Sequence, residues 1–192
     1  LGENVSDERE AISATQNYLM ALDCVKQIGI DANISIKLTA LGLDVSETLC
    51  TQNVRSILEC ARQCNVFVCV DMEGSIYTER TVAMTLQMHQ EFAQVGTVIQ
   101  SYLHRSEDDI THLIEQKVRV RLVKGAYKEP SEIAFQRKKE VDENFVHLMT
   151  MLLARSNYPA IATHDEAIVQ AACSYVRDHG IGRNQANRYV SI

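Results

Sequence analysis

Segments typical of β-strands and of α-helices alternate strictly along this chain, and this alternation constrains its fold more than any other feature. Strands are expected in five ranges: 33–39, 66–71, 96–102, 118–123 and 160–162. Helices are expected in six: 7–28, 46–63, 77–92, 106–116 with a capping box of Ser106 and Asp109, 131–155, and from Asp165 to before Gly180. Such an alternation predicts an α/β fold with a parallel sheet, either doubly wound or closed into a (β/α) barrel.

A polar residue stands at or near the carboxyl end of each predicted strand. These residues are Lys37, Asp71, Gln100, Arg121 and, just beyond the last strand, His164. Singly, each has an ordinary structural explanation, such as a solvated lysine, a turn-capping aspartate or a buried histidine with its hydrogen bonds satisfied. Because the carboxyl ends of parallel strands meet at one edge of the sheet, five such residues together favour an active or binding site at that edge.

The segment Val118–Pro130, VRVRLVKGAYKEP, becomes polar within a predicted strand. An arginine in an apolar strand is costly unless it meets an anion, and a glycine after the strand lets the backbone approach a ligand. We expect Arg121, Lys124 and Gly125 to form one wall of an anion- or cofactor-binding site. The alternative is an exposed edge strand that carries arginine for solubility. Together with Lys37, these cations indicate a ligand that carries carboxylate or phosphate.

Composition excludes several classes of function. The 192 residues suffice for one domain, and the net charge of −6 argues against a general nucleic-acid surface. No apolar run approaches the roughly 20 residues of a membrane helix. The six cysteines are scattered, which predicts reduced, buried thiols of a cytoplasmic protein and no metal centre. Neither a P-loop, a GxGxxG motif nor a Ser-His-Asp order is present.

Five segments resemble, in the right order, successive strand ends of the proline dehydrogenase family. They are ISIKLTALG (34–42), VDMEGSIYTERT (70–81), VIQSYLHRSEDD (98–109), VRLVKGAYKEP (120–130) and ATHD (162–165). The resemblance covers about residues 1–180 and implies a bacterial-type flavoenzyme on a distorted (β/α)8 TIM-type barrel. Such an enzyme oxidises L-proline to Δ1-pyrroline-5-carboxylate with FAD and passes the electrons to quinone.

The resemblance also implies roles by position. Lys37 would help to bind the proline carboxylate, Asp71 would be the active-site acid, and Arg121 would lie beside flavin N5. Contacts with FAD are implied for Met72 through its backbone and for Gln100, Lys124, Gly125, Ala126, Thr163 and His164. No residue stands out as the base that deprotonates the proline amine.

Residues 181–192 differ from the family's seventh strand, and the eighth strand with its arginine pair does not follow. We therefore expect residues 1–192 to form a partial barrel catalytic domain, covering roughly strands 1/2 to 6, with an atypical tail at 181–192. Unpaired strand edges and an opened interior should make these residues alone unstable, weak in FAD binding and inactive on proline.

Two other function classes stay open. One is a non-catalytic remnant, and the other is a (β/α) barrel lyase in which Lys37 or Lys124, with a lowered pKa, forms a Schiff base. For the dehydrogenase, L-proline and quinone are the expected partners, without nucleic acid. Reduction of a membrane quinone implies transient contact of a cytoplasmic protein with the inner membrane face, although no basic amphipathic helix stands out. The oligomeric state and the choice between proline and hydroxyproline stay open.

Overall fold

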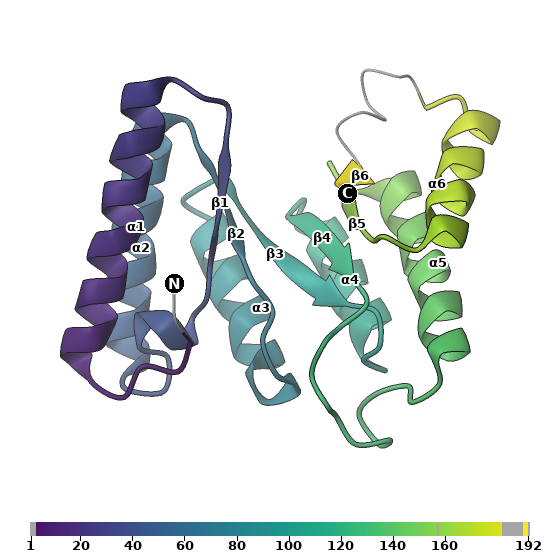
Figure 1. The fold of residues 1–192 in the computed structure, drawn as a ribbon, viewed down its shortest axis with the longest axis horizontal. Coiled ribbons are helices and arrows are strands. Elements are labelled where there is room, and N and C mark those ends of the chain that lie inside the picture. The colour runs from purple at the N-terminus through teal and green to yellow at the C-terminus, as the bar shows by residue number, and fades with distance from the viewer. Residues whose placement is uncertain (1–2, 157, 182–189, 192) are drawn as a thin grey trace. The chain divides into compact units, whose positions relative to one another are not determined.

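The computed structural model of the chain describes residues 3–156, 158–181 and 190–191, and Figure 1 shows its ribbon. Its strands are β1 (Asn33–Ile36), β2 (Phe67–Val70), β3 (Val95–Gln100), β4 (Arg119–Val123), β5 (Ala160–Ala162) and β6 (Val190–Ser191). The strand order in the sheet is β1-β2-β3-β4-β5-β6, and the β1–β2, β4–β5 and β5–β6 pairs are parallel. An order that follows the chain without reversal is that of a (β/α) barrel and not that of a doubly wound sheet.

Helices follow the strands as the alternation predicted. They are α1 (Glu8–Ile28), α2 (Glu47–Cys64), α3 (Ser75–His89), α4 (Ser106–Glu115), α5 (Lys138–Arg155) and α6 (Glu166–Asp178), with a short 3₁₀ helix at Thr39–Leu41. Side chains of Asp7, Ser46 and Asp165 accept the free backbone N–H groups at the starts of α1, α2 and α6. These three helix starts are therefore confirmed.

Two compact units make up the chain: Leu1–Asp71 with Glu79–Gly96, and Met72–Thr78 with Thr97–Ile192. In the first unit, α1 packs along α2 (Figure 1). The buried residues of α2 recur at helical spacing, as expected for an amphipathic helix that packs on a core. Its buried residues are Cys50, Asn53, Val54, Ile57, Leu58 and Ala61.

In the second unit, α5 packs against α4, α6 and β4. The buried face of α5 consists of Phe145, Leu148, Met149 and Leu152. Along β4, Val120 and Leu122 are buried while the other three residues are partly exposed, which confirms the predicted alternation. The polar face of this strand is the one that carries Arg121.

The predicted start of a helix at residue 131 is wrong, because α5 begins only at Lys138. Residues 131–133 form a turn, in which the N–H groups of Ile133 and Ala134 bond the Pro130 carbonyl oxygen. The backbone then pairs with the segment after β3, since Phe135 N–H donates to Tyr102 O at 2.8 Å. These tertiary hydrogen bonds outweigh the local helix-start signal.

The predicted capping box at the start of α4 is also wrong. The Ser106 hydroxyl does not cap the helix but donates to the Gln100 carbonyl oxygen at 2.5 Å. Asp109 instead accepts two hydrogen bonds from the Arg105 guanidinium, at 2.8 and 2.9 Å. Ser106 therefore ties α4 to the end of β3, a long-range use that a local motif does not reveal.

All six cysteines are free thiols, but the expectation that they are buried holds only in part, because Cys24 and Cys173 are exposed. In the part of the chain that the structure describes, no helix is long and apolar enough to cross a membrane. Of the predicted atypical tail, residues 182–189 and 192 lie outside the described residues.

Candidate active site

Lys37 and Asp71 meet in the first unit because of the register of two strands. β1 and β2 pair in parallel with Ile36 opposite Val70, so the residues that follow each strand are neighbours. Lys37 Nζ lies 3.4 Å from Asp71 Oδ2 and 3.3 Å from Glu3 Oε1. The side chains of Lys37 and Asp71 are 26% and 20% exposed, so water still reaches the pair.

Burial alone would lower the pKa of Lys37, but the charges and hydrogen bonds of Asp71 and Glu3 outweigh it and raise the pKa above its usual value. Lys37 is therefore held as an ammonium. A Schiff-base lysine needs the opposite shift, so the geometry disfavours the lyase alternative for this residue.

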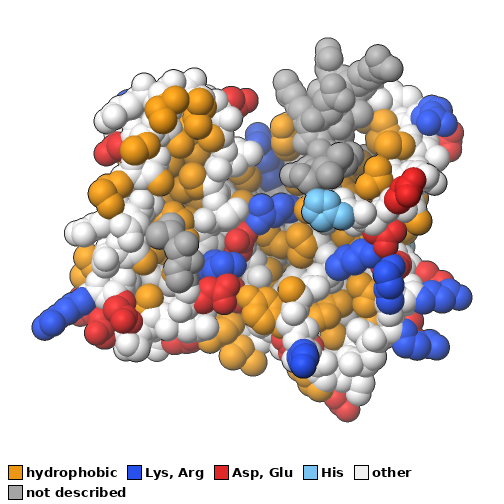
Figure 2. All heavy atoms as spheres, in the orientation of Figure 1, with side chains coloured by type: hydrophobic (Ala, Val, Ile, Leu, Met, Phe, Trp, Pro, Cys, Tyr) orange, Lys and Arg blue, Asp and Glu red, His pale blue; other side chains and the backbone are white. Residues whose placement is uncertain are grey.

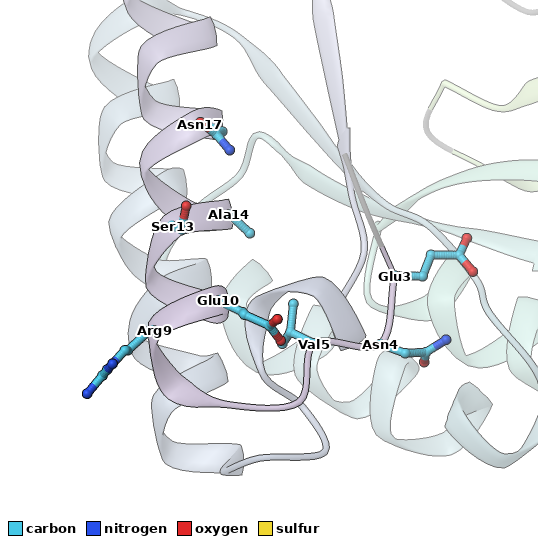
Figure 3. A pocket seen from close by; sticks show the side chains of 8 residues that line it. All are labelled: Glu3, Asn4, Val5, Arg9, Glu10, Ser13, Ala14 and Asn17. Carbon is cyan, nitrogen blue, oxygen red and sulfur yellow. The ribbon is translucent and has the colours of Figure 1, made fainter.

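Glu3 also borders an open groove in the first unit (Figure 3). The groove has a volume of about 500 Å³ and is lined by Glu3, Asn4, Val5, Arg9, Glu10, Ser13, Ala14 and Asn17. In the close-up, Arg9 points away from the groove while Ala14 and Asn17 face it. The N-terminal segment thus reaches the Lys37 pair from the edge of this groove.

Within the second unit, Gln100 holds the part of the β2–α3 connection that spans residues 72–74. Gln100, the last residue of β3, is 2% exposed, and its Nε2 donates to the Glu73 carbonyl oxygen at 2.9 Å. Met72 and Glu73 are themselves buried. Gln100 therefore fixes the backbone at Glu73.

Arg121, predicted near the carboxyl end of its strand, is the third of the five residues of β4. It lies opposite Ala160 in the β4–β5 register, is half-buried, and its Nε atom is buried. Arg119, two residues earlier on the same face, places its guanidinium 4.5 Å from the centre of the Tyr158 ring. Arg121 thus places a cation on the partly exposed face of β4.

The end of β4 carries a closed group of charges, here called the Lys124 cluster: Lys124, Lys138, Asp142 and Asp165. Lys124 Nζ lies 2.5 Å from Asp142 Oδ1 and 2.8 Å from Asp165 Oδ2. Lys138 contacts the same two carboxylates. Two cations therefore balance two anions. Figure 2 shows basic and acidic side chains side by side over the part of this unit that holds α5 and α6.

Hydrogen bonds from the two lysines hold the pKa of Asp165 well below its usual range. Burial would raise the pKa of Asp142, but its bonds from Lys124 and Lys138 outweigh this and lower it. A cavity of about 650 Å³ adjoins the cluster and is lined by Lys138, Lys139, Asp142, Glu143, Val146, Asp165, Ala167 and Ile168. Sequence reasoning missed Asp142 and Lys138, although their spacing on one helix face is a visible signal.

Gly125 has a structural reason to be glycine. Its φ is +114°, and a Cβ built there would lie 2.3 Å from Cδ1 of Tyr102. The ring of Tyr102 thus occupies the space that we expected a ligand to use. Burial raises the pKa of the Tyr102 hydroxyl to about 12, and the charge of Glu129 adds to the rise. Ala126, the next residue, is exposed.

Thr163 and His164 lie between β5 and α6. The Thr163 hydroxyl accepts the N–H of Asp165 at 3.1 Å, and Asp165 in turn caps α6. Because Asp165 also binds Lys124, the ends of β4 and β5 are joined. His164 is exposed.

Each unit therefore holds its own group of candidate residues, Lys37 and Asp71 in the first and the other eight in the second. The second group offers an arginine, an amide, a hydroxyl, an imidazole and backbone N–H groups, which suit a polar, anionic cofactor such as FAD. Lys124 is less suited to bind an anionic cofactor directly, because two carboxylates already neutralise its charge. Within the described residues, no group of three or more metal-binding side chains occurs.

Comparisons with known proteins agree with the resemblance. A family model described as "Proline dehydrogenase" matches residues 1–190, ten residues beyond the segment identified above. The chain is 40% identical over 185 residues to Proline dehydrogenase 1 of Bacillus subtilis subsp. natto, covering 96% of this chain and 61% of that protein. It is 34% identical over 189 residues to Proline dehydrogenase of Deinococcus radiodurans, with the same coverage.

Solved structures show the same fold. Proline utilization A from Bdellovibrio bacteriovorus, inactivated by N-propargylglycine, matches with a TM-score of 0.87 and 25% identity, over 97% of this chain and 24% of that chain. The chain spans 61% of the length of the curated relatives named above. With a family match over residues 1–190, the chain belongs to the proline dehydrogenase family.

Proposed function

We propose that the protein carrying this sequence oxidises L-proline to Δ1-pyrroline-5-carboxylate, with FAD as hydride acceptor and a quinone as the final electron acceptor. The observation that carries the proposal is the 40% identity over 96% of the chain to a protein named Proline dehydrogenase 1. Residues 1–192 would form part of one catalytic domain. The protein would be cytoplasmic and would approach the membrane only transiently, to reach the quinone.

Lys37 and Asp71 suit a zwitterionic amino acid. The Lys37 ammonium meets its two carboxylates at 3.3 and 3.4 Å while partly exposed, so these contacts are weak and exchangeable. A substrate carboxylate can replace one of them and keep the lysine paired. Asp71, at the end of the next strand, can then accept the amine end of the same molecule. The pair therefore orients proline, which is the main task left to the protein in such a reaction.

FAD, when bound, supplies the hydride chemistry itself. The residues of this chain hold and tune it. Arg121 places a fixed positive charge on the polar face of β4, which would stabilise negative charge that develops on the cofactor. Gln100 already donates its amide nitrogen to Glu73 O, so we propose that it meets the cofactor through its amide oxygen.

The remaining residues would line the path of the cofactor. Met72, Gly125 and Ala126 would contribute backbone groups, and Thr163 and His164 polar side chains. Lys124 would orient this wall through the Lys124 cluster, because its charge is already balanced by Asp142 and Asp165.

The test is an anaerobic visible spectrum of the purified protein that carries this sequence, before and after L-proline is added. We expect a two-band flavin spectrum that bleaches with L-proline, and bleaching that slows by about 100-fold in Arg121→Met. A folded protein without flavin, or one whose flavin is not bleached, contradicts the proposal. Trapping of a carbonyl substrate on Lys37 or Lys124 by borohydride would instead support the lyase alternative.

A further inference from the structure

A glutamate from a distant part of the chain binds the first residue of α3. Glu129 lies in the β4–α5 connection, residues 124–137, and is partly buried. Its Oε1 accepts the Ser75 backbone N–H at 2.7 Å, and its Oε2 accepts the Ser75 hydroxyl at 2.5 Å. Both bonds lie within the second unit. A carboxylate with two donors on one residue is a specific, charge-assisted contact.

The contact replaces a local helix cap. In α1 and α6, the residue before the helix supplies the capping carboxylate, Asp7 and Asp165. Before α3 that position is Gly74, which has no side chain to offer. Space is not the reason for this glycine, because an added Cβ would lie 3.7 Å from Glu129 Oε1, an ordinary contact. The start of α3 is thus satisfied by a residue 54 positions away.

The β4–α5 connection is tied at both ends by backbone bonds. Tyr102 N–H donates to Lys124 O at 2.9 Å, and His104 N–H donates to Ile133 O at 2.9 Å. Glu129 fastens its middle. The charge of Glu129 also reaches the Tyr102 hydroxyl, whose ring packs on Gly125.

The other end of the contact belongs to the β2–α3 connection. Ser75 follows Met72, Glu73 and Gly74 directly, and Gln100 holds the Glu73 carbonyl oxygen. Glu129 therefore joins two connections, and each of them carries residues that we propose to contact the cofactor. A change in this contact would alter the spacing between the two sets of backbone groups.

We propose that Glu129 is a positioning residue, which fixes the β4–α5 connection on the start of α3 and thereby sets the spacing of the backbone groups that receive the cofactor. The inference rests on the proposed function and goes beyond it, because Glu129 need not touch substrate or cofactor. The Glu129 carboxylate would have two separate effects: it caps α3, and it tethers the β4–α5 connection to the β2–α3 connection.

The tether is tested without flavin, by hydrogen exchange of the cofactor-free protein. Glu129→Ala should speed amide exchange in residues 124–137 as well as at the start of α3. In Glu129→Ala with Gly74→Ser, a local cap returns to α3, so exchange at α3 should recover while exchange in 124–137 stays fast. Unchanged exchange in 124–137 in the single variant would overturn the tether.

The role toward the cofactor is tested by flavin affinity. Glu129→Ala should weaken flavin binding about tenfold, and adding Gly74→Ser should restore the melting temperature but not the affinity. Glu129→Gln, which keeps an acceptor oxygen, should recover most of the affinity. Asp7→Ala is the matched control, because it removes a carboxylate cap of similar kind from α1 and should leave affinity within about twofold.

Recovery of flavin affinity by Gly74→Ser would show that Glu129 acts only as a helix cap, and this would overturn the inference. An equal loss of affinity in Asp7→Ala would overturn it as well. If the unaltered protein binds no flavin, the proposed function fails, and the tether is then tested by amide hydrogen exchange alone.

Discussion

Two lysines each follow a strand directly and meet two carboxylates, but they do so in opposite ways. Lys37, after β1, lies 3.3 Å from Glu3 and 3.4 Å from Asp71. Lys124, after β4, lies 2.5 Å from Asp142 and 2.8 Å from Asp165. The first group has one cation for two anions, whereas Lys138 completes the second with another cation.

The difference indicates what each lysine can do. The two lysines are about equally exposed, but the contacts of Lys37 are longer and therefore weaker, so Lys37 can exchange a carboxylate of the chain for one of a ligand. Short contacts in a balanced network leave Lys124 no charge to offer, and exchange there would leave a carboxylate unpaired. We therefore assign Lys37 to substrate binding and Lys124 to the shape of the cofactor wall.

The largest expected effect is at Lys37. Lys37→Met should lower kcat/KM for proline about 100-fold, mainly through a higher KM, because the substrate carboxylate loses its cation. The flavin spectrum should not change. Steady-state kinetics measure this, with Lys26→Met in α1 as the control that removes a lysine elsewhere. An unchanged KM would remove Lys37 from the substrate site.

At the end of β4, Gly125 packs tightly against the Tyr102 ring, and Gly125→Ala tests this packing. The new Cβ would meet the Tyr102 ring at 2.3 Å, and the backbone φ of +114° disfavours any side chain. We expect a loss of about 2 kcal/mol in the free energy of unfolding, measured by denaturant titration. Tyr102→Ala in the same chain should recover the part due to the clash but not the part due to φ. Full additivity of the two variants would contradict this packing.

The two lysines of the Lys124 cluster make a matched pair. Lys124→Met should weaken flavin binding about tenfold, because Asp142 and Asp165 keep only Lys138, whose side chain is 73% exposed. Lys138→Met should change flavin binding by no more than about twofold, since Lys124 remains. Flavin titration of both variants measures the difference. Equal losses would show that total charge matters and not the position of Lys124.

The smallest expected effect is on the stability of the protein at acidic pH. The pKa values of Asp142 and Asp165 lie below the usual 3.8, so their contribution to stability is complete above that pH and is lost as pH falls through the lower folded values. Asp165→Asn keeps a helix cap but removes the charge. The stability difference between the unaltered protein and this variant should stay constant from about pH 7 to 5 and shrink below about pH 4. A difference that is independent of pH would contradict the network.

Local signals allowed much of the fold to be predicted. The helix starts at Asp7, Ser46 and Asp165 and the alternation along β4 are each determined by residues close in sequence. The candidate residues at the strand ends were proposed from the same kind of local signal, and their roles stay predictions.

The predictions from sequence fail where contacts between residues far apart in the chain determine the local structure. The start of α5 was misplaced because residues 133–135 pair with 102–104. The role of Ser106 was misread because its partner is the carbonyl group of Gln100. Glu129 has its partner Ser75 far away along the chain, so no local pattern marks it, whereas Asp142 also pairs with Lys138 four residues earlier, which is a signal that the sequence does contain. Contacts such as Glu129–Ser75 and Ser106–Gln100 carry no short-range pattern, so only the structure reveals them.

The most direct test of this account is the proline dependence of flavin reduction, measured anaerobically in rapid mixing for the Lys37→Met and Lys124→Met proteins loaded with flavin. We predict that Lys37→Met needs about 100-fold more proline for half-maximal reduction, while Lys124→Met keeps the half-saturating proline concentration within about twofold. The opposite pattern, a proline defect in Lys124→Met and none in Lys37→Met, would contradict the assignment of the two lysines.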